Sequence, residues 1–208
     1  DGRLYKANDM VKADCGGCNG CSRCCHGMGN SIILDPYDVY RMTTGMGKSM
    51  QELLAASVEL NVVDGVILPN LKMQGTKEAC AYLDEEGRCS IHPYRPGICR
   101  LFPLGRYYEN GGFSYFLQTG ECAKENRSKI KVSKWIDTPD LTRNQQFTLQ
   151  WHDLLHAMEE RLTGEDEGKQ QEENLLLLRL FYLLPYKGTT DFYSQFMERM
   201  EYWNEQIR

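Results

Sequence analysis

Apolar side chains in the last third of the chain recur at helical spacing. The pattern predicts three helices, which run from Thr138-Pro139 to about Leu162, from about 169 to 184, and from about 190 to 206. The stretch LLLLRLFYLL in the second helix is apolar almost all round, so we expect it to be the most buried. A matching stripe on the third helix consists of Phe192, Phe196, Met200 and Trp203. We interpret these stripes as ordinary core packing; a helical lid or a dimer face is the alternative.

The middle of the chain carries two local signals for short helices. Asp35 precedes Pro36 and Asp38, a combination typical of a helix start, and this helix is predicted to end near Gly45. Ser49 and Glu52 form a capping box for a second helix that ends at about Ser57.

Three pairs of short runs predict β-hairpins. VELNVV and VILPNLKM flank Asp64-Gly65, and GRYYEN and GFSYFLQT flank Asn110-Gly111-Gly112. ACAYLD and GRCSIH flank Glu85-Glu86-Gly87, and this hairpin would bring Cys80 close to Cys89. The aromatic residues near Asn110 are expected to pack beside a metal centre rather than to bind a ligand.

These elements predict an α+β protein, in which a small cysteine-rich module of short helices and β-hairpins surrounds a metal centre and is followed by three helices. The chain has 208 residues, which is enough for one domain or a domain with an appendage. The expected organisation is a surface arm over 1–14, a cysteine module over 15–125, a basic connector over 126–138 and a helical segment over 139–208 that packs on the module.

Charge and hydropathy limit the classes of partner. A net charge of -5 argues against nucleic acid, which requires a concentrated basic face. No run of 18 apolar residues is present, so no membrane span is expected. The chain begins at Asp1 without a signal-peptide pattern, and we expect a cytoplasmic protein whose protein or small-molecule partner the sequence does not identify.

Nine cysteines carry the strongest chemical signal, and five of them lie in CGGCNGCSRCC, residues 15 to 25. Disulfides are disfavoured because the number is odd and a chain of this size needs no covalent staples. Free buried cysteine would explain one or two positions, but not five in a loop rich in Gly, Asn and Ser. Closely spaced thiolates in a glycine-containing loop instead favour a soft metal ion or a cluster.

The spacing leaves the metal open. Cys15, Cys18 and Cys21 reproduce the C-x2-C-x2-C run of bacterial ferredoxins, but Cys24 follows at x2 and Cys25, not proline, comes next. Paired C-x2-C knuckles with two distant thiolates are equally typical of zinc. Adjacent Cys24 and Cys25 should diverge, so that they serve different centres or different ends of one.

Eight thiols are enough for two four-coordinate centres, or for one polynuclear cluster with a structural zinc, and Cys15 is then spare. The eight candidate ligands are Cys18, Cys21, Cys24, Cys25, Cys80, Cys89, Cys99 and Cys122.

Three segments together resemble the YkgJ-type cysteine-cluster family, a zinc- or iron-chelating CxxCxxCC domain. They are CNGCSRCC at 18–25, IILDPYDVYRM at 32–42 and CAYLDEEGRCSIHPYRPGICRLFPL at 80–104. The resemblance covers about 15–125, and Cys122 fits the late cysteine of the family. It implies metal or iron–sulfur binding, mostly without an assigned reaction. His92 stands where a tyrosine is expected, which makes it a weak ligand candidate.

Other polar residues have both a site role and a plainer one. Arg95 and Arg100 flank Cys99 and could offset the negative charge of a thiolate-bound cluster, or equally could shape the loop through hydrogen bonds. Pro93 and Pro96 should hold Cys99 in a short helical turn. His152 and His156 share a helix face at the separation used by bis-histidine metal sites, although packing is favoured.

Two functional hypotheses follow. The first is a protein that holds iron–sulfur clusters, with [4Fe-4S] favoured, for redox or cluster-dependent enzymatic chemistry. The alternative is a zinc-binding structural or interaction module without catalytic activity. The sequence does not decide whether the chain is an enzyme.

Overall fold

Two hydrophobic clusters organise the fold of the computed structural model, which describes residues 2–16, 21–124 and 126–207. The larger, here called the large core, lies among α1, α2, a β3–β4 hairpin and the C-terminal helices. The smaller, the small core, lies among β1, β2, β8, α3 and α4. Helices and small antiparallel sheets are mixed along the chain, so the predicted α+β class is confirmed.

The local helix signals in the middle of the chain are confirmed. Helix α1 (Pro36–Met46) begins with a capping box in which Asp35 accepts the Asp38 N–H at 2.8 Å. It ends at Met46, one residue after the predicted end, because Gly47 has a left-handed φ of 65° and caps it. Helix α2 (Met50–Ala56) has the predicted Ser49–Glu52 capping box.

Two of the three predicted hairpins are present. Strands β3 (Val58–Val63) and β4 (Val66–Leu71) pair through a turn at Asp64-Gly65, where both residues have positive φ. Strands β7 (Leu104–Glu109) and β8 (Gly112–Leu117) form the hairpin around Asn110-Gly111.

The hairpin expected at Glu85-Glu86-Gly87 is shorter than predicted. Leu83 and Cys89 form one antiparallel bridge, and the Ser90 N–H donates to the Tyr82 carbonyl at 2.9 Å. Strand β6 (Ala79–Cys80) pairs instead with β5 (Met73–Gln74), so the downstream pairing begins only after Cys80. Cys80 and Cys89 therefore do not lie opposite each other in a ladder.

The N-terminal segment and the expected connector are structured, contrary to the prediction of a surface arm and a linker. Strand β1 (Leu4–Tyr5) adds to β8, and β2 (Met10–Asp14) pairs with β9 (Ser128–Lys131). Val11 and Ala13 are 1% and 0% exposed. Helix α4 (Val132–Ile136) follows directly after β9. Strands β1 and β2 are too short for a periodic signal, and their partners lie more than 100 residues away in sequence.

The three C-terminal helices are confirmed as α5 (Leu141–Leu162), α6 (Glu167–Leu178) and α7 (Phe192–Gln206). Helix α6 continues as a π-helical turn, Arg179–Leu183. Phe181 lies 5.1 Å from Trp151 and 6.0 Å from Trp203, between ring centroids, so this turn packs between α5 and α7. The run LLLLRLFYLL is nevertheless not buried all round, because Leu175 and Leu184 are 57% and 49% exposed.

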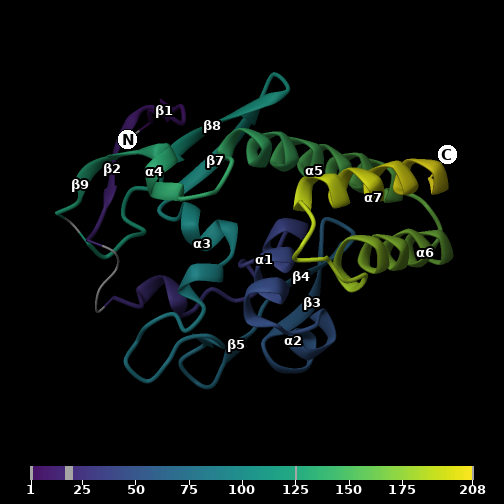
Figure 1. Cartoon of the computed structure of the whole chain (residues 1–208), viewed down its shortest axis with the longest axis horizontal. Coiled ribbons are helices and arrows are strands. Elements are labelled where there is room, and N and C mark those ends of the chain that lie inside the picture. The colour runs from purple at the N-terminus through teal and green to yellow at the C-terminus, as the bar shows by residue number, and fades with distance from the viewer. Residues whose placement is uncertain (1, 17–20, 125, 208) are drawn as a thin grey trace.

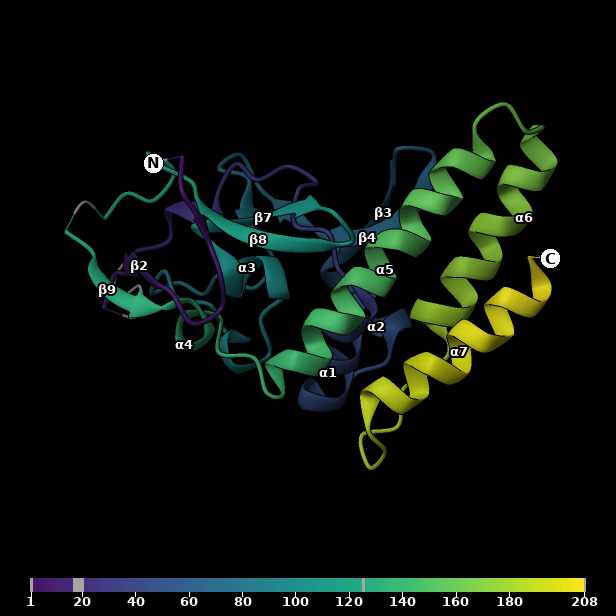
Figure 2. The same cartoon turned by 90° about the horizontal axis from the view of Figure 1, so that it is seen from above.

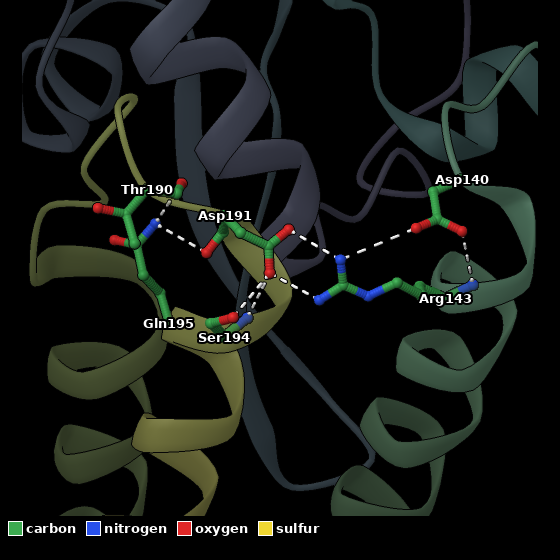
Figure 3. Close-up of polar contacts among 6 residues, drawn as sticks. All are labelled: Asp140, Arg143, Thr190, Asp191, Ser194 and Gln195. Carbon is green, nitrogen blue, oxygen red and sulfur yellow. Dashed lines mark hydrogen bonds and ion pairs between the residues drawn. The ribbon is translucent and has the colours of Figure 1, made fainter.

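Polar contacts join the starts of α5 and α7 (Figure 3). Arg143 donates to both carboxylate oxygens of Asp191, at 3.1 and 2.7 Å. Asp191 also caps α7 by accepting the Ser194 N–H at 2.9 Å. The pair fixes the crossing of the two helices, which lie with α6 at one end of the molecule, whereas β2 and β9 lie at the other (Figure 2).

Helix α3 (Gly97–Leu101), preceded by a 3-10 turn at His92–Tyr94, lies between α4 and α1 in the view of Figure 1. Leu101 belongs to the small core, whereas Cys99 packs against the large core. The single helical turn expected around Cys99 is thus confirmed. Among the described residues, no helix is long and apolar enough to cross a membrane.

Candidate metal centre

The segment that carries Cys24 and Cys25, here called the first arm, is attached through one β-bridge to the segment that carries Cys80, Cys89 and Cys99, here called the second arm. A 3-10 turn, Arg23–Cys25, is followed by an isolated antiparallel bridge between His26 and Ala79. The Gly27 N–H donates to the Glu78 carbonyl at 2.9 Å beside it. In an antiparallel pair the residues on either side of a bridge also face each other, so Cys25 lies next to Cys80.

The second arm supplies three thiols from three different local structures. Cys80 ends β6, Cys89 lies in the bridge with Leu83, and Cys99 lies on α3. All three are half-buried and pack against the large core. Together with Cys24 and Cys25 they form a group that we call the five-thiol cluster.

Helix α3 is held in place by Asp38, which the sequence pattern indicated only as part of the start of α1. Asp38 is buried and accepts the Gly97 N–H at 2.6 Å, which ties α3 to α1. Burial and the charge of Asp35 together raise the pKa of Asp38 to about 7, against the opposing effects of Arg100 and the Gly97 N–H. The contact joins residues 59 positions apart, so no local pattern could have revealed it.

Cys24 and Cys25 face each other, contrary to the expectation that their side chains diverge, because the 3-10 turn brings their thiols within hydrogen-bond reach. The hydrogen bond from Cys25 lowers the pKa of Cys24 to about 6, against the opposing effect of burial, and the charges of Arg95 and His26 contribute. The same bond raises the pKa of Cys25, as does burial. Cys24 is therefore the thiol of the cluster that ionises most readily.

The remaining thiols of the cluster resist ionisation. Burial is the main cause that raises the pKa values of Cys80, Cys89 and Cys99. The charges of neighbouring thiolates add to each shift, and Cys24 contributes to all three. A bound cation would offset this repulsion, since metal binding releases the protons of thiol ligands.

The chain matches a family model over residues 17–132, more than half of its length. The family is CxxCxxCC, described as a "Putative zinc- or iron-chelating domain". The chain belongs to this family. Membership supports binding of zinc or iron, and the matched region contains every thiol of the five-thiol cluster. No curated protein and no solved structure matches the chain.

The other candidate ligands of this CxxCxxCC chain lie apart from the cluster or outside the described residues. Cys18 lies outside the described residues. Cys21 precedes the 3-10 turn, and Cys122 lies at a bend between β8 and β9. Cys15 directly follows β2.

The donor chemistry of the five-thiol cluster fits a soft metal or an iron–sulfur cluster, because sulfur ligands from three segments meet in a half-buried place. Among residues 2–16, 21–124 and 126–207, no three His, Cys, Asp or Glu side chains are arranged so that they could hold a metal ion as they stand.

The two arginines expected near the cluster have different surroundings. The charge of Arg95 favours the thiolate forms of Cys24 and Cys89, although burial still raises the pKa of Cys89. Arg100 is 4% exposed and donates to Thr138 Oγ1 at 2.7 Å while facing Asp38. The surroundings of Arg100 match the loop-shaping alternative, whereas Arg95 is placed to act on the thiols.

The histidine pair on α5 is occupied by packing. The His152 ring stacks on Tyr108 with centroids 3.8 Å apart, and the His156 ring lies 6.4 Å from that of His152, with its Nδ1 3.5 Å from Glu160. The aromatic residues of the β7–β8 hairpin thus pack partly against α5. His92 is exposed and lies in the turn before α3.

Proposed function

We propose that this chain holds an iron–sulfur cluster through the five-thiol cluster and uses it for redox or cluster-dependent chemistry. The proximity of Cys24, Cys25, Cys80, Cys89 and Cys99 carries the proposal, because an iron–sulfur cluster is held by four cysteine thiolates. Zinc takes the same number of thiolates, and the C-x2-C-x2-C run in the first loop favours iron–sulfur between the two. An iron–sulfur cluster supplies one-electron transfer when bound.

The chain's own residues would prepare the site for such a group. Cys24 ionises first, and its thiolate is the natural first ligand. Arg95 places positive charge beside Cys24 and Cys89, which would offset the negative charge of a thiolate-bound cluster. Packing of Cys80, Cys89 and Cys99 on the large core limits access of water to the sulfur atoms.

A structural zinc is the second candidate. Cys24 acts electrostatically on Cys80, Cys89 and Cys99, and these four thiols would complete a tetrahedral site without Cys25. Whether the five-thiol cluster holds iron–sulfur or zinc, we propose that a further metal centre is supplied by Cys18, Cys21 and Cys122.

Anaerobic purification followed by metal and sulfide analysis, absorbance and EPR separates the two candidates. We expect a coloured protein that contains iron and acid-labile sulfide. A colourless protein with stoichiometric zinc would overturn the iron–sulfur proposal. Metal analysis of Cys24→Ser and Cys25→Ser then shows which of the adjacent thiols is a ligand, because removal of a ligand should lower the metal content and removal of a bystander should not.

Matched serine variants map the ligands. Cys99→Ser should lower the iron content, and Cys15→Ser, the control in the same loop as the first arm, should retain it. Cys122→Ser should lower total metal without changing the absorbance of the five-thiol centre. Unchanged iron in Cys99→Ser would remove this residue from the ligand set.

A further inference from the structure

A second candidate site lies at the opposite end of the small core from the C-terminal helices. A pocket of about 390 Å³ opens between β1, β2 and β9, and four basic residues line it: Arg3, Lys12, Arg127 and Lys129. None of the described residues that line it is acidic. Asp14, at the end of β2, is engaged by Ser128 and by the Gly16 N–H.

This concentration of positive charge is built into the fold rather than scattered on flexible tips. Lys12 and Lys129 lie on paired strands, and Arg127 directly precedes β9. Like charges on adjacent strands repel each other, so the pairing of β2 with β9 holds the cations together against their repulsion. An anion between them would remove this repulsion.

Arg127 points to the kind of ligand that the pocket accepts. Its Nε and Nη1 atoms are buried and have no hydrogen-bond partner among the described residues. Buried guanidinium donors are normally paired, so Arg127 keeps unused donors beside a basic pocket, and its fixed charge suits an oxyanion.

The remaining wall suits an organic group attached to the anion. Tyr5, Met10 and Leu117 line the same pocket, and Tyr5 and Leu117 also belong to the small core, so their positions are fixed by packing. The pocket volume falls in the range of small-molecule sites. We propose that this pocket binds the phosphate group of a small phosphorylated molecule, with Arg127 as the guanidinium donor and Lys12 and Lys129 as charge partners.

Calorimetric titration of the full chain with phenyl phosphate tests the proposal, with phthalate as a dianion that lacks a phosphate. We expect phenyl phosphate to bind more tightly than phthalate. Arg127→Gln should weaken its binding about tenfold or more, as expected for loss of a charge-assisted contact. Arg179→Gln, which removes an exposed arginine from the far end of the molecule, should leave binding unchanged.

Three outcomes would overturn the proposal: no binding of phenyl phosphate, equal or tighter binding of phthalate, or equal weakening by Arg127→Gln and Arg179→Gln. Thermal unfolding shows whether Arg127→Gln remains folded. Lys12→Gln provides a second variant on an independent strand, and it should weaken binding and reduce its salt dependence. The metal content of each variant should remain that of the unmodified chain.

Discussion

His26 and Ala79 form an antiparallel bridge, and this one pairing sets Cys25 of the first arm beside Cys80 of the second. The Gly27 N–H, which donates to the Glu78 carbonyl, extends the pairing by one residue. Along the sequence, the two arms are separated by α1, α2 and the β3–β4 hairpin. The geometry of the five-thiol cluster therefore depends on a short backbone contact that contains no cysteine.

Gly27→Pro should weaken metal binding although it removes no thiol. Gly27 has a φ of 65°, and proline both forbids this value and lacks the N–H that reaches Glu78. We expect metal affinity, measured by competition with a chromogenic chelator, to fall about tenfold. Gly29→Pro imposes similar strain at a φ of 54° without removing a bond to the second arm. Equal losses in the two variants would contradict a specific role for the bridge.

Gly45→Ala should destabilise the protein, although alanine normally favours a helix over glycine. A Cβ at this position of α1 would collide with the ring of Tyr94, which lies in the turn before α3. We expect the free energy of unfolding, measured by urea denaturation, to fall by about 1–3 kcal/mol. In a Tyr94→Ala background the same substitution should instead stabilise by up to about 1 kcal/mol. A loss that persists in that background would locate the cause elsewhere.

His152→Ala should change stability and leave metal content unchanged. Loss of the stack on Tyr108 is expected to lower the free energy of unfolding by about 1 kcal/mol. His156→Ala, whose ring lies near Glu160 at an exposed position, should have a smaller effect. Elemental analysis of both variants provides the test, and a fall in bound metal in either would restore the bis-histidine interpretation.

The Arg143–Asp191 pair should make stability depend on acid pH. Partial burial would raise the pKa of Asp191, but the hydrogen bonds from Arg143 and Ser194 outweigh it and hold the pKa below its usual range. The contribution is therefore complete above the unfolded-state pKa of about 4 and is lost as the pH falls through the lower folded-state pKa.

Asp191→Asn should accordingly lower the free energy of unfolding at about pH 6 by about 1 kcal/mol, and by less as the pH approaches about 3. Urea denaturation across this range gives the comparison. Arg143→Gln, which retains the bonds from Ser194 to Asp191, should lose only part of the dependence. A constant difference between the Asp191→Asn and unmodified proteins at every pH would rule out Asp191 as the titrating group.

Local chemistry made much of the fold predictable. The Asp35 and Ser49 caps and the turn at Asp64-Gly65 act within a few residues, so each was recognisable from the sequence. Strands β1, β2 and β9 were missed because each is short and pairs with a distant segment. The hairpin around Gly87 is shorter than predicted, because β6 pairs with β5, which lies upstream of it.

The sequence by itself determined the donor chemistry, because closely spaced cysteines in a glycine-containing loop predict a thiolate site whatever the surrounding fold. Only the tertiary structure decided which thiols meet. Cys25 and Cys80 lie together through a bridge between distant segments, and Cys99 is placed by a hydrogen bond from Gly97 to Asp38. Such contacts depend on long-range packing of α1 and α3, which leaves no periodic pattern around any cysteine.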